Sequence, residues 1–149
     1  MGIRDSHMTR VILSFLLLVT LASAALAEAQ PPSSSGAVFV AYYWRAKPGQ
    51  VEAYNDYIRK IAEPIDEDAR RAGVFEEIRT VMAAPGAAQD WTHLRIFRLK
   101  NMAAADALAA GLDAATARIV PNEATRKANS DRSAGLRDFV RREVWTELR

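Results

Sequence analysis

Between residues 38 and 73 the apolar positions change from the period of a strand to that of a helix. Residues 38–45 are rich in β-branched and aromatic side chains, which favours a β-strand that ends at Pro48-Gly49. From residue 51 onward the apolar residues recur at spacings of three and four, which predicts one apolar stripe on an α-helix. The stripe consists of Val51, Tyr54, Ile58, Ile61, Ile65, Ala69 and Ala72.

Two residues shape this helix. Pro64 lies inside the pattern and has no backbone N–H, so we expect it to kink the helix or to split it. Gly73 follows two arginines and provides a C-terminal stop.

The middle of the chain predicts two more strands and a second helix. Residues 74–82 and 91–99 read as strands joined by a loop, and the second of them alternates cleanly. Asn101 then caps an alanine-rich helix over residues 102–120, in which Gly111 is tolerated.

The tail leaves alternatives open. Residues 123–132 are polar and form a short helix or an irregular link. Residues 136–148 fit a helical stripe of Leu136, Phe139, Val140, Val144 and Leu148, or a strand with Val140, Val144, Thr146 and Leu148 on one side. Their β-rich centre favours a fourth strand.

The order strand, helix, strand, strand, helix, strand predicts an α+β domain over residues 37–149. Such a chain forms a ferredoxin-like antiparallel sheet with both helices on one face. The other face stays bare, and a second copy of the chain is the economical cover for it. We therefore expect a homodimer.

The N-terminal residues read as processing segments. Residues 1–7 resemble an expression scar, because Ser6-His7-Met8 looks like a cloning junction. Residues 8–27 have the positive start, the apolar centre and the Ala-Leu-Ala end of a signal peptide, with cleavage before Glu28. Residues 28–36 are a linker by composition. We expect a periplasmic or secreted protein without a stable membrane anchor after cleavage.

Composition excludes several classes of protein. The chain has no cysteine, so neither a disulfide framework nor a lipid-modified cysteine is available. Its formal net charge is only +2, which argues against nucleic-acid binding through a clustered basic face. No nucleophile elbow, P-loop, dinucleotide fingerprint or metal-ligand cluster is visible, so we predict no cofactor and no metal site.

Residues 40–49, Val-Ala-Tyr-Tyr-Trp-Arg-Ala-Lys-Pro-Gly, and the following helix with Glu52 and Tyr54 resemble the dimeric α/β-barrel superfamily. The resemblance implies that two ferredoxin-like subunits close their sheets into one barrel. Members include antibiotic-biosynthesis-type monooxygenases, haem-degrading enzymes, stress-responsive barrel proteins and uncharacterised exported proteins, and this chain is most similar to the last. No catalytic set of the superfamily matches residue by residue, and the second helix has no histidine to bind haem.

Strand alternation predicts a site in the barrel interior. The aliphatic sets of the three strands, such as Val38 and Val40 or Leu94 and Ile96, should face the helices. The mixed polar sets should then face the interior of the barrel. This hypothesis places Tyr43, Arg45, Glu77, Arg79, Trp91, His93 and Arg95 in one cavity.

Each side chain has a functional and a structural interpretation. His93 is the candidate general acid or base, or else a hydrogen-bonded cross-strand neighbour. Arg79 and Arg95 clamp an anion, or else form an ion-pair lattice with Glu77 or Glu143. The aromatic residues line an apolar ligand pocket or pack as core and interface. They are Trp44, Trp91, Trp145, Tyr42 and Tyr43.

Three functions follow from these interpretations. The first is an exported homodimer that binds a small, partly aromatic or anionic molecule in its cavity. The second is a cofactor-independent enzyme with monooxygenase-like or isomerase-like activity that uses His93 and an arginine. The third is a structural dimer with a filled barrel and no ligand.

Overall fold

The computed structural model describes residues 36–148, so the predicted scar and signal peptide, and all of the predicted linker except Gly36, lie outside the described residues. The elements follow the expected order, with one additional helix. The strands are β1 (Val38–Ala46), β2 (Glu77–Met82), β3 (His93–Leu99) and β4 (Arg137–Thr146). The helices are α1 (Val51–Tyr57), the π-helical turn η1 (Ile58–Ala62), α2 (Glu63–Arg71), α3 (Met102–Ile119) and α4 (Glu123–Leu136).

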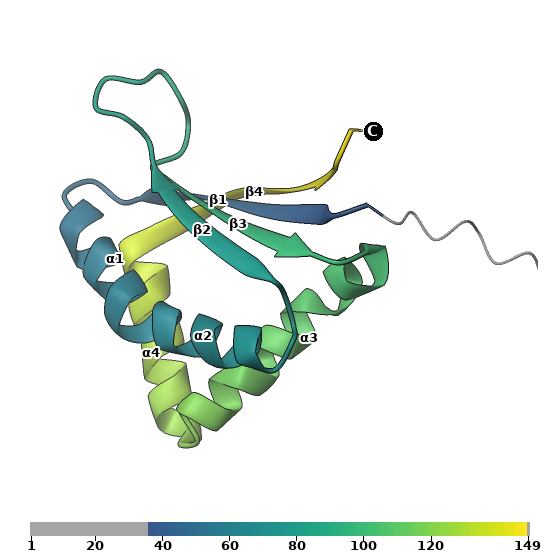
Figure 1. Cartoon of the computed structure of the whole chain (residues 1–149). Coiled ribbons are helices and arrows are strands. Elements are labelled where there is room, and N and C mark those ends of the chain that lie inside the picture. Colours follow the sequence, from purple (N-terminus) through teal and green to yellow (C-terminus); the bar gives the residue numbers. More distant parts are fainter. Residues whose placement is uncertain (1–35, 149) are drawn as a thin grey trace, which may run out of the picture. The chain divides into compact units, whose positions relative to one another are not determined.

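The four strands form an antiparallel sheet in the order β2-β3-β1-β4. The helices lie on one face of this sheet, and the loop between β2 and β3 extends beyond the strand ends (Figure 1). This is the ferredoxin-like arrangement that the sequence predicts. The last segment of the chain is a strand, as its β-rich centre favours, and the polar segment before it is the helix α4.

The first helix is interrupted where Pro64 requires it. The α-helical pattern changes to a π-helical turn over Ile58–Ala62 and returns to α-helix at Glu63, with Pro64 in the first turn of α2. A wider turn accommodates the missing N–H and the bulk of the proline ring. Gly73 ends α2 with φ +76°, and the backbone N–H of Val74 donates to the carbonyl of Ala69 over 3.0 Å. The N–H of Gly73 also donates to the carbonyl of Arg70 over 3.0 Å, and the two bonds together form the Schellman motif.

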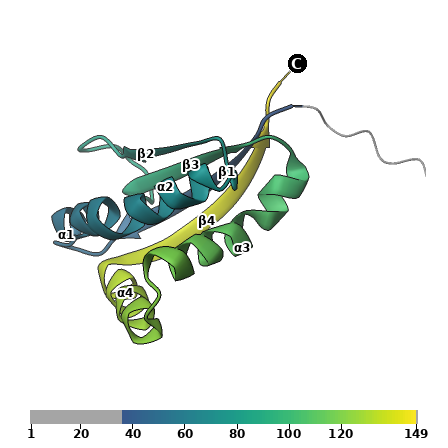
Figure 2. The ribbon, with the colours of Figure 1, turned by 60° about the horizontal axis from the view of Figure 1, so that its bottom comes forward.

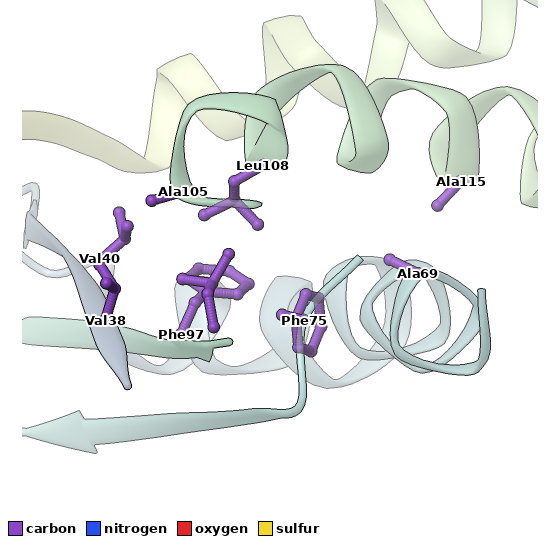
Figure 3. Close-up of a cluster of buried hydrophobic side chains, with 9 residues drawn as sticks. Val38, Val40, Ala69, Phe75, Phe97, Ala105, Leu108 and Ala115 are labelled. Atoms are coloured by element: carbon purple, nitrogen blue, oxygen red, sulfur yellow. The ribbon is translucent and has the colours of Figure 1, made fainter. Parts of the chain in front are cut away.

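The main core lies between the sheet and α3. Val38 and Val40 of β1 and Phe97 of β3 pack against Leu108 of α3, and all four are nearly inaccessible to solvent (Figure 3). The Asn101 side chain caps α3 by accepting from the Ala104 N–H over 2.9 Å, as predicted. Burial of this apolar surface is the main force that holds α3 on the sheet.

Gly111 has a packing role that its helix position alone does not indicate. A Cβ at this position would lie 2.4 Å from Cγ1 of Val74. The close approach of α3 to the end of α2 therefore requires a residue without a side chain here.

The helix α4 is the addition to the predicted pair of helices. It begins at Asn122, whose side chain accepts from the Thr125 N–H over 2.9 Å, and it runs directly into β4 (Figure 2). Ser133 and Leu136 are its buried residues. Between residues 36 and 148, no helix combines the length and apolar character that a membrane span needs.

A β-bulge in β4 changes the side-chain alternation along that strand. The pairing of β1 with β4 shifts between Tyr43 and Trp44, so that Tyr43 lies opposite Arg141 and Trp44 lies opposite Phe139. Val140 is the extra residue of the bulge.

Candidate functional site

The sheet register divides the predicted site residues between two faces. His93 and Arg95 lie opposite Trp44 and Tyr42 of β1, on the face that carries the helices. The other members lie on the open face, away from the helices. They are Tyr43, Arg45, Glu77, Arg79 and Trp91. The prediction of one shared cavity is therefore wrong, because His93 and Arg79 are on opposite faces.

The error arises in β3. Its aliphatic residues Leu94 and Ile96 pack with Ala41 and Tyr43 on the open face, whereas Phe97 enters the main core under α3. The predicted assignment is correct for Val38 and Val40 of β1.

His93 is completely buried against the first helix. Its Nε2 lies 2.9 Å from Oδ1 of Asn55, and its Nδ1 lies 2.8 Å from the hydroxyl of Thr92. The Tyr54 ring meets the imidazole edge-on, with 4.5 Å between the centroids. Burial lowers the pKa of His93, and the nearby charge of Arg137 lowers it further. A neutral imidazole that donates from Nε2 to Asn55 and accepts from Thr92 satisfies both partners.

Arg95 forms an ion pair with Asp66 of α2, and both side chains are mostly buried. Burial raises the pKa of Asp66, while the Arg95 guanidinium opposes that shift. The Nε of Arg95 is buried and has no hydrogen-bond partner within residues 36–148. Arg95 is therefore one member of a buried ion pair and is not part of the predicted lattice with Glu77 or Glu143.

A network of hydrogen bonds and ion pairs lies on the open face. Tyr43 donates to Glu143 over 3.0 Å, and Arg141 donates to the same carboxylate over 2.8 Å. Burial raises the pKa of Tyr43, and its hydrogen bond to Glu143 raises this pKa further. Trp91 packs edge-on against Tyr43, with 5.7 Å between the ring centroids.

The remaining predicted residues on this face are exposed. Arg79 pairs with Glu77 at 2.6 Å, which agrees with the structural interpretation of that arginine. Arg45 donates to the backbone carbonyl of Asp90 over 2.6 Å.

Three adjoining hollows on the helix side of the sheet form what we call the helix-side cleft. The inner hollow, of about 260 Å³, is lined by Tyr42, Trp44, Arg95, Phe97 and Leu112, among others. The outer hollow, of about 650 Å³, lies along α4 and includes Trp44, Tyr57 and Phe139. A deep hollow of about 160 Å³ continues under η1. Arg137 lines all three.

Arg137 is held in place by groups from three elements. Its guanidinium carbon lies 3.5 Å from the centre of the Trp44 ring. Its Nη1 donates to the hydroxyl of Tyr54 over 2.5 Å, and its Nε donates to the hydroxyl of Ser133 over 2.9 Å. Burial raises the pKa of Tyr54, and the Arg137 charge opposes that shift.

Sequence reasoning identified Tyr42 and Trp44 as candidate pocket residues but missed Arg137, Tyr54 and Asp66. A usable signal was present, because Asn55 and Asp66 are polar residues that fall within the apolar stripe of the first helix. Polar side chains in such a stripe need buried partners, which here are His93 and Arg95.

The chemistry available in the cleft is aromatic stacking and recognition by guanidinium groups. Within residues 36–148, no group of three or more acidic or histidine side chains is placed to hold a metal ion.

No protein-family model and no curated protein sequence matches the chain. Among solved structures, HapK from Hahella chejuensis is similar over 74% of this chain and 92% of its own, with 13% identity and a TM-score of 0.51. A dimeric protein of unknown function and ferredoxin-like fold from Bacteroides fragilis NCTC 9343 covers 77% of this chain and 97% of its own, with 9% identity and a TM-score of 0.43.

A dimeric ferredoxin-like protein of unknown function from Thermobifida fusca YX covers 79% of this chain and 95% of its own, with 12% identity and a TM-score of 0.39. At these identities the likeness concerns the fold alone. Together with the strand order β2-β3-β1-β4, the likeness to HapK shows that the chain has the ferredoxin-like fold.

Proposed function

We propose that the protein binds a small, planar aromatic molecule in the helix-side cleft. The observation that carries the proposal is the inner hollow, where Tyr42, Trp44 and Phe97 provide aromatic walls and Leu112 of α3 provides an aliphatic one. Ligand sites are typically concave and apolar, with a few polar groups that fix orientation. The inner hollow adjoins the larger outer one, so a ligand has a path from solvent.

Binding is favoured over catalysis by the position of His93. A general acid or base must come within about 2.6–3.2 Å of the proton that it transfers. Both ring nitrogens of His93 already have partners, Asn55 and Thr92, and the side chain is fully buried. His93 is therefore a hydrogen-bonded core residue that lines none of the three hollows, in agreement with its structural interpretation.

A matched pair of tryptophan substitutions tests the proposal. Ala109 and Ala110 are both exposed residues of α3, but Ala109 lines the inner hollow and Ala110 does not. Two-dimensional amide NMR would follow a panel of planar aromatic compounds, with 2-naphthamide as the reference probe. We expect shifts of the amides around Trp44 and Leu112, which disappear in Ala109→Trp and remain in Ala110→Trp. The proposal fails if no compound of the panel shifts these amides at millimolar concentration.

We further propose that the protein is a homodimer that associates through the open face of the sheet. Ala41, Tyr43 and Leu94 form an apolar cluster on that face, with Ile96 and Val140 packed beside it. Trp145 and Val81 on the same face remain 38% and 41% exposed. The cluster itself is buried within one protomer, so the exposed side chains of Val81 and Trp145 are what a partner would cover. Exposed apolar side chains of this kind are typical of association sites, and a two-fold dimer would cover them on both copies.

Export to the periplasm or the exterior of the cell is also part of the proposal. It rests on the signal-like pattern of residues 8–27. Mass spectrometry of the protein recovered from a periplasmic extract should give a mature chain that begins at Glu28. Recovery of the uncleaved chain in the cytoplasmic fraction would contradict export.

A further inference from the structure

We infer that the ligand of the helix-side cleft is an aromatic carboxylate whose anionic group binds the guanidinium of Arg137. This inference rests on the proposed function and adds the charge and the orientation of the ligand. Arg137 is the one side chain shared by all three hollows, so a ligand in any of them lies beside it.

The first support is the way in which Arg137 is fixed. Its plane is held on the Trp44 ring, and two of its nitrogens, Nε and Nη1, donate to Ser133 and Tyr54. Within residues 36–148 its third nitrogen, Nη2, has no side-chain hydrogen-bond partner. A guanidinium that is already oriented loses little conformational freedom when it binds a carboxylate.

The second support is the charge of Arg137. Its partners Trp44, Tyr54 and Ser133 are all uncharged, and no carboxylate of residues 36–148 lies within ion-pair distance of it. Arg137 is half-buried, and a cation that is partly removed from water is costly unless an anion compensates it. A ligand carboxylate would supply that anion.

The other arginine of the inner hollow does not offer the same opportunity. Arg95 is already paired with Asp66. Its role is to line the cleft beside Phe97, whose ring centre lies 5.5 Å from its guanidinium carbon. In the inner hollow, the charge that remains for recognition is therefore the one on Arg137. The outer hollow adds Arg126, which donates to the backbone carbonyls of Val120 and Pro121 and forms no ion pair within residues 36–148.

The carboxylate of Asp113 in α3 should weaken the binding of an anionic ligand to the cleft. It lines both the inner and the outer hollow, together with Arg137, but it is exposed and forms no ion pair within residues 36–148. A carboxylate at the mouth of the cleft opposes the entry of an anion. Its removal should strengthen the binding of a carboxylate ligand and leave a neutral ligand unaffected.

The experiment compares 2-naphthoate with 2-naphthamide, which have the same fused rings but differ in charge. Isothermal titration of the intact protein should show that naphthoate binds about tenfold more tightly, as expected for a charge-assisted hydrogen bond. In Arg137→Gln the two affinities should agree within about twofold. In Asp113→Asn the preference for naphthoate should increase.

The matched control is Arg132→Gln, which removes an exposed arginine of α4 that lines none of the three hollows. It should retain the preference of the wild-type protein. Because Arg137→Gln alters internal hydrogen bonds, the wild-type protein provides a second measurement. Its affinity for naphthoate should decrease with salt concentration, whereas its affinity for naphthamide should not.

The outcomes separate this inference from the proposed function. Equal binding of both compounds by the wild-type protein, with shifts of the amides around Trp44, would overturn the carboxylate inference and leave the binding function intact. A preference that persists unchanged in folded Arg137→Gln would also overturn it. The absence of any shift around Trp44 with either compound would overturn the carboxylate inference, and the absence of shifts with the whole panel would overturn the binding function as well.

Discussion

The guanidinium of Arg137 stacks on the indole of Trp44, with 3.5 Å between its central carbon and the ring centre. The contact joins the first residue of β4 to β1, and the same guanidinium donates to the buried Tyr54. Arg137→Gln should therefore lower the free energy of unfolding by about 1–3 kcal/mol, because the Tyr54 hydroxyl loses a charged donor and the stack is lost. Arg142→Gln should change it by less than about 0.5 kcal/mol. Urea denaturation of both variants measures the difference, and equal stabilities would contradict the structural role of Arg137.

His93 should make the stability of the protein depend on pH. Burial lowers its pKa in the folded state, so the unfolded state binds the proton more readily. The stability that neutral His93 contributes is complete above the unfolded pKa of about 6.5 and is lost as the pH falls through the folded pKa. Tyr54 packs against the imidazole, and burial raises its pKa further above this range.

Urea denaturation between about pH 5 and pH 8, at a fixed protein concentration, measures this dependence. The wild-type protein should lose stability toward the acidic end. His93→Gln keeps a side-chain N–H that can donate to Asn55 but removes the imidazole that titrates. In this variant, the part of the pH dependence of the unfolding free energy that is due to His93 should disappear. A slope that is the same in both proteins would show that another group is responsible.

Gly111 within α3 and Gly135 in the last turn of α4 should respond in opposite ways to substitution by alanine. Gly111→Ala should lower the free energy of unfolding by about 1–3 kcal/mol, because its Cβ would overlap the Val74 side chain. Gly135→Ala should be neutral or stabilising by up to about 1 kcal/mol, because nothing lies within 4 Å of its Cβ. Val74→Ala in the Gly111→Ala background should recover part of the loss. A Gly111→Ala variant as stable as the wild-type protein would contradict the close approach.

Introduction of a charged side chain into the open face tests the proposed dimer. Ile96 lies on that face opposite Ala41 and Arg79, at the edge of the apolar cluster. Ile96→Glu would place a carboxylate in the desolvated interface, and sedimentation should show a monomer. The control Ile119→Glu changes an exposed isoleucine at the end of α3 and should stay dimeric. A wild-type protein that sediments as a monomer would refute the dimer.

Local patterns predicted most of the fold. The residue spacing after Gly49, the Asn101 cap and the Gly73 stop each depend on residues that are near one another in sequence, and each is confirmed. The same local rules placed a break at Pro64 but did not specify a π-helical turn.

The face of β3 could not be predicted in this way. Alternation divides a strand into two sets but does not say which set meets the helices. The aliphatic set seemed the natural choice, yet Leu94 and Ile96 lie on the open face. The helices instead supply Asn55 and Asp66 as partners for His93 and Arg95, which makes burial of polar residues acceptable. Such a choice depends on contacts between residues that are far apart in sequence.

The bulge at Val140 has a consequence for how the length of β4 can vary. In a strand of regular alternation, Arg137, Phe139 and Arg141 would all lie on a single face. With Val140 as the extra residue, Arg137 contributes to the cleft and Arg141 packs on Tyr43 of the open face. Deletion of Val140 would remove the bulge but leave Phe139 opposite Trp44 and Arg141 opposite Tyr43, so each arginine would keep its face. The strand can therefore lose this one residue without an exchange of chemistry between the two faces.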